Sequence, residues 1–175
     1  KILDLMNRKH TIEEYLEIFD KLKEINSNIE FSSDFIIGYP GEEEEDFKDT
    51  YNLISRIKFI NSYSFIFSPR PGTKAADLEL IDRKVSMKRL EKVQSQLFEN
   101  QLLKNKSLEE KTLNVLVENL TDNKKQVFGR SEHMTSVIFD GNKNDIGKII
   151  PIKIKRGSRS TLFGEKITNS NKKVA

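Results

Sequence analysis

The chain has 175 residues, of which 36% are hydrophobic and 33% charged, and it carries a formal net charge of +3. No apolar run approaches the roughly 20 residues that a membrane-spanning helix needs. Because the sequence contains no cysteine, this chain alone can hold neither a disulfide framework nor an iron–sulfur cluster or thiolate metal site.

Charge is unevenly distributed along the sequence. Residues 1–107 hold 17 basic and 19 acidic side chains, a net charge of −2, whereas residues 108–175 hold 13 and 8, a net charge of +5. This asymmetry indicates two units, of which the second faces a polyanion. The alternative is that the charge only keeps the second unit soluble. Because the sequence opens at Lys1 in an uncapped, helix-like segment, we expect it to be a fragment of a longer protein.

The first part alternates between helix and strand patterns. Thr11 and Glu14 form a capping box, after which apolar residues recur at three- and four-residue steps, as in an amphipathic helix. The segment 31–37 has apolar residues on both faces and lies between two helices, so we expect a buried parallel strand. Acidic residues 42–46 oppose the positive end of the next helix's dipole. This order predicts βα units with a parallel sheet: helix to residue 25, strand 31–37, a helix that starts with the acidic residues 42–46, strand 61–67 and helix 86–105.

After Leu108 the pattern changes to short β-rich segments separated by Asn, Asp and Gly turns. Five short strands at this spacing predict a small closed barrel of the OB or SH3-like kind. Because residues alternate across a strand, Lys153, Lys155 and Arg156 are expected to form one outward basic face. The boundary between the two parts is expected near residues 106–110. The predicted strands are 112–117, 126–130, 136–140, 148–155 and 161–167.

Two loops are candidate ligand-binding segments. Residues 38–42 (Gly-Tyr-Pro-Gly-Glu) and 68–73 (Ser-Pro-Arg-Pro-Gly-Thr) follow the two predicted strands, and parallel α/β barrels place their chemistry at the C-terminal strand ends. Asp34, a carboxylate among apolar strand residues, needs a partner, either ligand hydroxyl or ammonium groups or a structural cation. Arg8 is either a surface residue or a bidentate partner for a carboxylate. No clustered metal ligands, Walker motif or Rossmann pattern is present, so no metal site is predicted.

Three segments together carry a family resemblance. They are residues 6–16 (Met-Asn-Arg-Lys-His-Thr-Ile-Glu-Glu-Tyr-Leu), 34–42 (Asp-Phe-Ile-Ile-Gly-Tyr-Pro-Gly-Glu) and 63–73 (Tyr-Ser-Phe-Ile-Phe-Ser-Pro-Arg-Pro-Gly-Thr). In order, spacing and content they resemble the methylthiotransferase family of radical S-adenosylmethionine (SAM) enzymes. The tail, at residues 127–130, 136–141 and 146–148, resembles the TRAM RNA-binding domain that ends these enzymes.

The resemblance implies an α/β fold, the C-terminal portion of a partial TIM-like radical SAM barrel over residues 1–107. A small all-β TRAM barrel over residues 108–170 and a tail at 171–175 would follow. Family members bind and cleave SAM at one [4Fe–4S] cluster and handle sulfur at a second, and another SAM supplies the methyl group. The cysteines for both clusters are missing here, so we expect this chain alone to be inactive and to need the N-terminal part of the same protein.

The resemblance also assigns site residues by position. Arg8 is expected to pair with the SAM carboxylate, Asp34 to bind its ribose or amino group, and Gly38 to line the same pocket. The pocket mouth, near SAM or the target base, is expected to include Phe67, Ser68 and Arg70.

RNA phosphates are expected to bind the basic face of the second part, because cations there give affinity and salt dependence. Phe128 and Phe163 are candidates for base contacts, but we expect both rings to belong to the barrel core. The predicted phosphate-binding residues are Lys124, Lys125, Arg130, Lys153, Lys155, Arg156 and Arg159.

Within the family, the Ser-Pro-Arg-Pro-Gly-Thr loop favours the cytoplasmic tRNA-modifying member that adds a methylthio group to C2 of N6-isopentenyladenosine beside the anticodon. Its partners would be SAM and the anticodon stem-loop, without a membrane. The alternatives are the enzymes for threonylcarbamoyladenosine in tRNA or for ribosomal protein S12, a non-catalytic RNA-binding module, and a protein-interaction domain. A partial barrel also leaves an open edge and an exposed apolar face.

Overall fold

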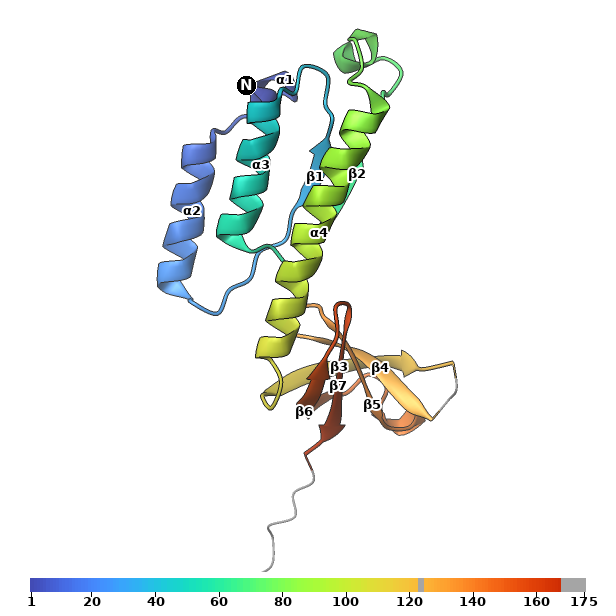
Figure 1. Cartoon of the computed structure of the whole chain (residues 1–175). Coiled ribbons are helices and arrows are strands. Elements are labelled where there is room, and N and C mark those ends of the chain that lie inside the picture. The colour runs from blue at the N-terminus through green and yellow to red at the C-terminus, as the bar shows by residue number, and fades with distance from the viewer. Residues whose placement is uncertain (123–124, 168–175) are drawn as a thin grey trace, which may run out of the picture. The chain divides into compact units, whose positions relative to one another are not determined.

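The computed structural model describes residues 1–122 and 125–167. The chain divides into two compact units, residues 1–97 and residues 98 onward, and the division falls within one long helix. Figure 1 labels the helices and strands of both units. The domain limit expected after residue 107 stays a prediction.

The first unit has the predicted alternation of helices and strands, with β1 and β2 paired in parallel and Asp34 opposite Tyr63. A parallel two-stranded sheet with intervening helices is therefore confirmed. Its elements are α1 (Ile2–Leu5), α2 (Ile12–Ile25), β1 (Asp34–Ile37), α3 (Glu44–Ile57), β2 (Tyr63–Ile66), the 3₁₀ helix η1 (Lys74–Asp77) and the first part of α4 (Arg83–Ser107).

Side-chain caps fix where the helices begin. The Thr11 hydroxyl accepts a hydrogen bond from the Glu14 backbone N–H at 3.2 Å, and the Thr11 N–H donates to the Glu14 carboxylate at 2.8 Å. The predicted capping box of α2 is thus confirmed. Before α4, the Asp82 carboxylate accepts from the N–H groups of Lys84 and Val85. This cap starts α4 three residues earlier than the apolar pattern predicts.

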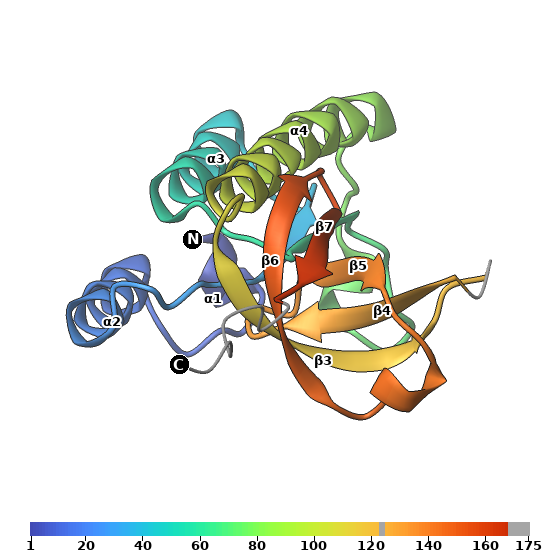
Figure 2. The same ribbon diagram turned by 90° about the horizontal axis from the view of Figure 1, so that it is seen from below.

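One face of the small sheet is buried and the other is exposed. Phe35 and Ile37 point into an apolar core formed with α3 and α4, which lie over the same face of the sheet in Figures 1 and 2. On the opposite face Ile36, Tyr63 and Phe65 are 40%, 66% and 53% exposed. The expectation that the first strand is buried on both faces is wrong, because no described segment of this unit covers that side. The exposed apolar face expected of a partial barrel is confirmed.

The second unit is a closed barrel with strand order β3-β4-β5-β7-β6, in which β5 and β7 are parallel and the other pairs antiparallel. The five predicted strands and their closure are confirmed. The strands are β3 (Thr112–Leu120), β4 (Gln126–Ser131), β5 (Ser136–Asp140), β6 (Ile149–Gly157) and β7 (Thr161–Lys166), with the short 3₁₀ helix η2 (Lys143–Asp145) before β6.

Alternation along the strands builds the barrel core. Every second residue of β4 and β5 is buried, because successive side chains of a strand point to opposite faces. Side chains fill the interior, as in other small barrels. The core residues with no measurable exposure are Val115, Val127, Val137, Ile152, Ile154 and Leu162.

The Asp145 carboxylate ties η2 to β7 and gives the barrel a pH dependence. It accepts hydrogen bonds from Lys166 Nζ at 2.7 Å and from the Asn142 N–H at 2.8 Å. The Lys166 bond first, and then the Asn142 N–H, lower the pKa of Asp145. A lowered folded-state pKa contributes stability above the unfolded value, about 3.9, and that stability is lost as pH falls through the folded value.

We therefore expect Asp145→Asn to lower the barrel's melting temperature at pH 7. The difference in melting temperature between the variant and the parent chain should shrink below about pH 4. Thermal unfolding followed by circular dichroism between pH 7 and pH 3 measures this. A difference of constant size over that range would contradict the role of the Asp145 charge.

Candidate cofactor-binding loops and nucleic-acid interface

The loop after β1 is held by a positive-φ glycine and by two hydrogen bonds, one buried and one partly buried. Gly38 has φ +73°, and a Cβ there would lie 2.4 Å from the Ser86 hydroxyl oxygen, so only glycine fits without strain. The Gly38 N–H donates to Glu42 Oε2 at 2.9 Å. The Tyr39 hydroxyl donates to the Leu5 carbonyl at 2.9 Å, which docks α1 against this loop.

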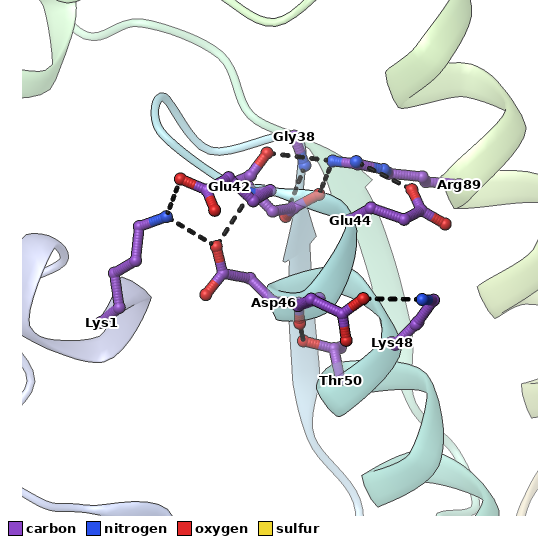
Figure 3. A network of polar contacts seen from close by, with 10 residues as sticks. Lys1, Gly38, Glu42, Glu44, Asp46, Lys48, Thr50 and Arg89 are labelled. Atoms are coloured by element: carbon purple, nitrogen blue, oxygen red, sulfur yellow. Dashed lines mark hydrogen bonds and ion pairs between the residues drawn. The ribbon is translucent and has the colours of Figure 1, made fainter.

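A buried ion pair fixes the same loop to α4. Glu42 Oε1 lies 2.7 Å from Arg89 Nη1, and the two side chains are only 5% and 9% exposed. Arg89 also donates to Glu44 Oε2 at 3.0 Å and lies over the Phe47 ring. Figure 3 shows dashed lines from Glu42 to both Gly38 and Arg89, so one carboxylate fixes both the backbone N–H and the guanidinium.

Sequence reasoning missed this pair. It placed Glu42 with the acidic residues that oppose the helix dipole, but α3 begins at Glu44, and only residues 44–46 occupy its first turn. Glu42 is instead buried against a residue 47 positions away. No local pattern near Glu42 could have indicated so distant a partner.

The loop after β2 lies beside the loop after β1. The Phe67 N–H donates to the Ile37 carbonyl at 2.8 Å, and the rings of Phe67 and Tyr39 pack edge to face with centroids 4.9 Å apart. Ser68 and Arg70 are exposed. The two predicted ligand loops therefore meet at the C-terminal ends of the strands, where ligands bind in parallel α/β sheets.

Of the three predicted SAM residues, two lie toward that end. Arg8 is exposed and follows α1, which docks on the loop that Gly38 opens. Asp34 begins β1, so it lies at the opposite end of the strand. It is exposed, on the same face as Ile36. The premise that Asp34 is a buried carboxylate needing a partner is wrong, because the strand turns this residue toward the uncovered face.

The predicted basic residues do point outward from the barrel, but several of them form ion pairs with acidic residues. Ile154 points inward, and Lys153 and Lys155 point outward, as predicted. A bulge after Ile154 lets Arg156 point outward too. Lys124 lies outside the described residues, and Lys125 is exposed. The ion pairs of the face are Lys153–Glu110 at 2.7 Å, Lys155–Glu165 at 3.1 Å and Arg130–Glu118 at 3.6 Å.

Arginine–aromatic contacts complete this face. Arg159 lies 4.3 Å from the centroid of Phe98, and Arg156 lies 4.1 Å from that of Phe163. The expectation that Phe128 and Phe163 belong to the core is wrong. Their neighbours Val127 and Leu162 point inward, so alternation turns the two rings outward, where they are only partly buried.

Within residues 1–122 and 125–167, no three or more His, Cys, Asp or Glu side chains group as a metal site would require. No helix in the same ranges has the length and apolar character of a membrane span.

Comparison with protein families agrees with this two-part geometry. Residues 1–54 match the radical SAM superfamily, and residues 106–167 match the TRAM domain. The chain therefore contains part of a radical SAM domain followed by a TRAM domain. The resemblance drawn from the three motifs and the β-rich tail is confirmed.

Particular relatives match over nearly all of the chain. It is 62% identical, over all 175 residues, to 39% of the tRNA-2-methylthio-N(6)-dimethylallyladenosine synthase of Pelagibacter ubique (strain HTCC1062). Synthases of the same name from Ruthia magnifica subsp. Calyptogena magnifica and Wolbachia pipientis wMel are 44% and 41% identical over 95% and 94% of the chain, each across 38% of the relative. The chain thus spans about two fifths of the length of these relatives. These relatives carry the name of MiaB, the family member that acts on N6-isopentenyladenosine. The sequence of the loop at 68–73 predicts the same member.

Proposed function

We propose that this chain is part of a cytoplasmic tRNA-modifying enzyme that methylthiolates C2 of N6-isopentenyladenosine next to the anticodon. The observation that carries the proposal is the sequence identity to a synthase named for that product. The identity is 62% and extends over all 175 residues of this chain. In this proposal residues 1–107 end the radical SAM domain, 108–170 form the TRAM domain and 171–175 are a tail.

The exposed side of β1 and the two adjacent loops would bind SAM. Asp34 and Ile36 share one exposed face, so an elongated ligand lying along this side of the strand can reach from Asp34 to the loop that follows β1. The exposed Asp34 carboxylate can accept from ribose hydroxyls or an ammonium group, and Arg8 can pair with a carboxylate. The mouth of the pocket would be formed by Phe67, Ser68 and Arg70.

This chain lacks the residues that would bind the iron–sulfur clusters of the proposed enzyme. Their protein ligands are cysteine thiolates, and the chain has none. Cleavage of SAM and sulfur insertion would therefore depend on the N-terminal part of the enzyme. The residues described here bind and orient SAM and RNA.

RNA binding by the barrel can be tested with this chain alone. We expect it to bind an anticodon stem-loop RNA, with log K falling linearly with log salt by about 0.7–0.9 per phosphate contact. Arg156→Ala should reduce that slope by about one. Lys84→Gln is the matched control, because Lys84 is an exposed cation of the first unit and should leave the slope unchanged. Absence of binding even at low salt would contradict an RNA-binding barrel.

A further inference from the structure

Four strands of the barrel align a row of side chains on its outer face. Phe128 in β4 pairs with Ile138 in β5, which pairs with Phe163 in β7, which in turn pairs with Arg156 in β6. Register partners in a sheet point to the same side. We call Phe128, Ile138 and Phe163 the aromatic row. All three are partly exposed, whereas the residue before each is fully buried.

A guanidinium lies over each ring of the row. Arg130 Cζ is 5.2 Å from the centroid of Phe128, and Arg156 Cζ is 4.1 Å from the centroid of Phe163. Arg130 is anchored further by donating to the Met134 carbonyl at 3.1 Å. A planar guanidinium over a ring is itself a flat surface on which a base can stack, and it can still donate its N–H groups to phosphate.

The distribution of charge favours a neutral, flat ligand with an anionic backbone. The aromatic row itself contains no charged residue, and arginines lie at both of its ends. Three carboxylates lie near the row: Glu118 and Glu165 pair with Arg130 and Lys155, and Asp140 accepts a hydrogen bond from the Gln126 side chain at 3.1 Å. Nucleic acid bases supply flat neutral surfaces and phosphates supply the negative charge.

We propose that the aromatic row, with Arg130 and Arg156, is a platform on which unpaired RNA bases stack. The proposal rests on the proposed function, in which the barrel binds tRNA, and it adds the structural class of RNA that this surface recognises. Strands lie 4.7–4.9 Å apart, so the two rings, with one strand between them, are about 10 Å apart. That separation suits two splayed bases. A duplex keeps its bases stacked inside and cannot offer them.

The test compares single-stranded with duplex RNA. Affinities of the chain are measured for an unstructured RNA of about ten nucleotides, within the usual site size, and for an RNA duplex with the same number of phosphates. In the double variant Phe128→Leu/Phe163→Leu we expect the single-strand affinity to fall about tenfold or more, since stacking is lost. Its salt slope and its duplex affinity should stay unchanged.

Two further variants serve as controls. Phe128→Tyr/Phe163→Tyr keeps both rings and should retain the single-strand affinity, which separates lost stacking from a damaged barrel. Ile18→Ala removes an apolar side chain that is 59% exposed on α2 of the first unit and should have no effect on the affinity for either RNA.

The outcomes distinguish the inference from the proposed function. Salt-dependent RNA binding that survives in the leucine double variant would overturn the stacking platform and leave RNA binding by the barrel intact. Failure of the parent chain to bind either RNA would overturn both, and the arginine–aromatic face would then have to serve another class of partner, such as a protein.

Discussion

Replacing Arg89 with methionine is expected to destabilise the first unit by about 3–5 kcal/mol, because it leaves the buried Glu42 carboxylate without its counterion. The two side chains are 9% and 5% exposed, so water cannot replace the lost contact. The same carboxylate accepts from the Gly38 N–H, so the loop after β1 should lose order together with the pair.

Urea unfolding followed by tyrosine fluorescence measures this effect in the correct unit. The four tyrosines, Tyr15, Tyr39, Tyr51 and Tyr63, all lie in the first unit, and the chain has no tryptophan. Arg56→Met is the matched control. It breaks an exposed pair with Asp20 and should change the free energy of unfolding by less than about 1 kcal/mol.

A double variant separates a lost pair from lost packing. Glu42→Gln/Arg89→Met removes the uncompensated charge and should recover part of the stability that Arg89→Met loses. If Arg89→Met and Arg56→Met had equal, small effects, the buried pair would not be what fixes the loop.

Gly38→Ala is expected to destabilise the first unit by about 2–5 kcal/mol. The left-handed backbone conformation costs an alanine about 1–2 kcal/mol, and the clash with Ser86 adds about 1–3 kcal/mol. The added Cβ would lie 2.4 Å from the hydroxyl oxygen and 2.9 Å from the Cβ of Ser86.

Gly72→Ala isolates the backbone contribution. Gly72 has φ +79°, but nothing lies within 4 Å of a Cβ placed there. We therefore expect it to lose only the conformational cost, about 1–2 kcal/mol. Ser86→Gly should recover part of the loss in Gly38→Ala and none of that in Gly72→Ala. Equal effects of the two alanine substitutions in tyrosine-detected unfolding would contradict the steric argument.

Features set by neighbouring residues could be predicted from the sequence. The Thr11 capping box and the five barrel strands depend on residue types within a few positions of one another. The pairing of the two ligand loops also followed, because parallel strands end at one edge of a sheet. The three motifs identified the family, which the periodicity of apolar residues alone does not specify.

Features set by distant contacts could not be predicted. The partner of Glu42 lies on α4, and a run of acidic residues gives no sign that one of its members is buried. Asp34 was misjudged because a strand with apolar residues on both faces does not show which face is covered. Phe128 and Phe163 were misjudged because large aromatic residues usually belong to a core, although alternation along β4 and β7 turns them outward.

Methylthiolation of tRNA by the proposed enzyme can be tested with a chimera. The matching segment of the relative that is 62% identical is replaced by this chain, and the chimera is expressed in cells that lack the endogenous enzyme. Mass spectrometry of tRNA nucleosides is expected to show conversion of N6-isopentenyladenosine to its 2-methylthio derivative, and Asp34→Ala in the chimera should reduce that conversion. A folded chimera that carries its clusters and binds tRNA, yet leaves the isopentenyladenosine unconverted, would contradict the account.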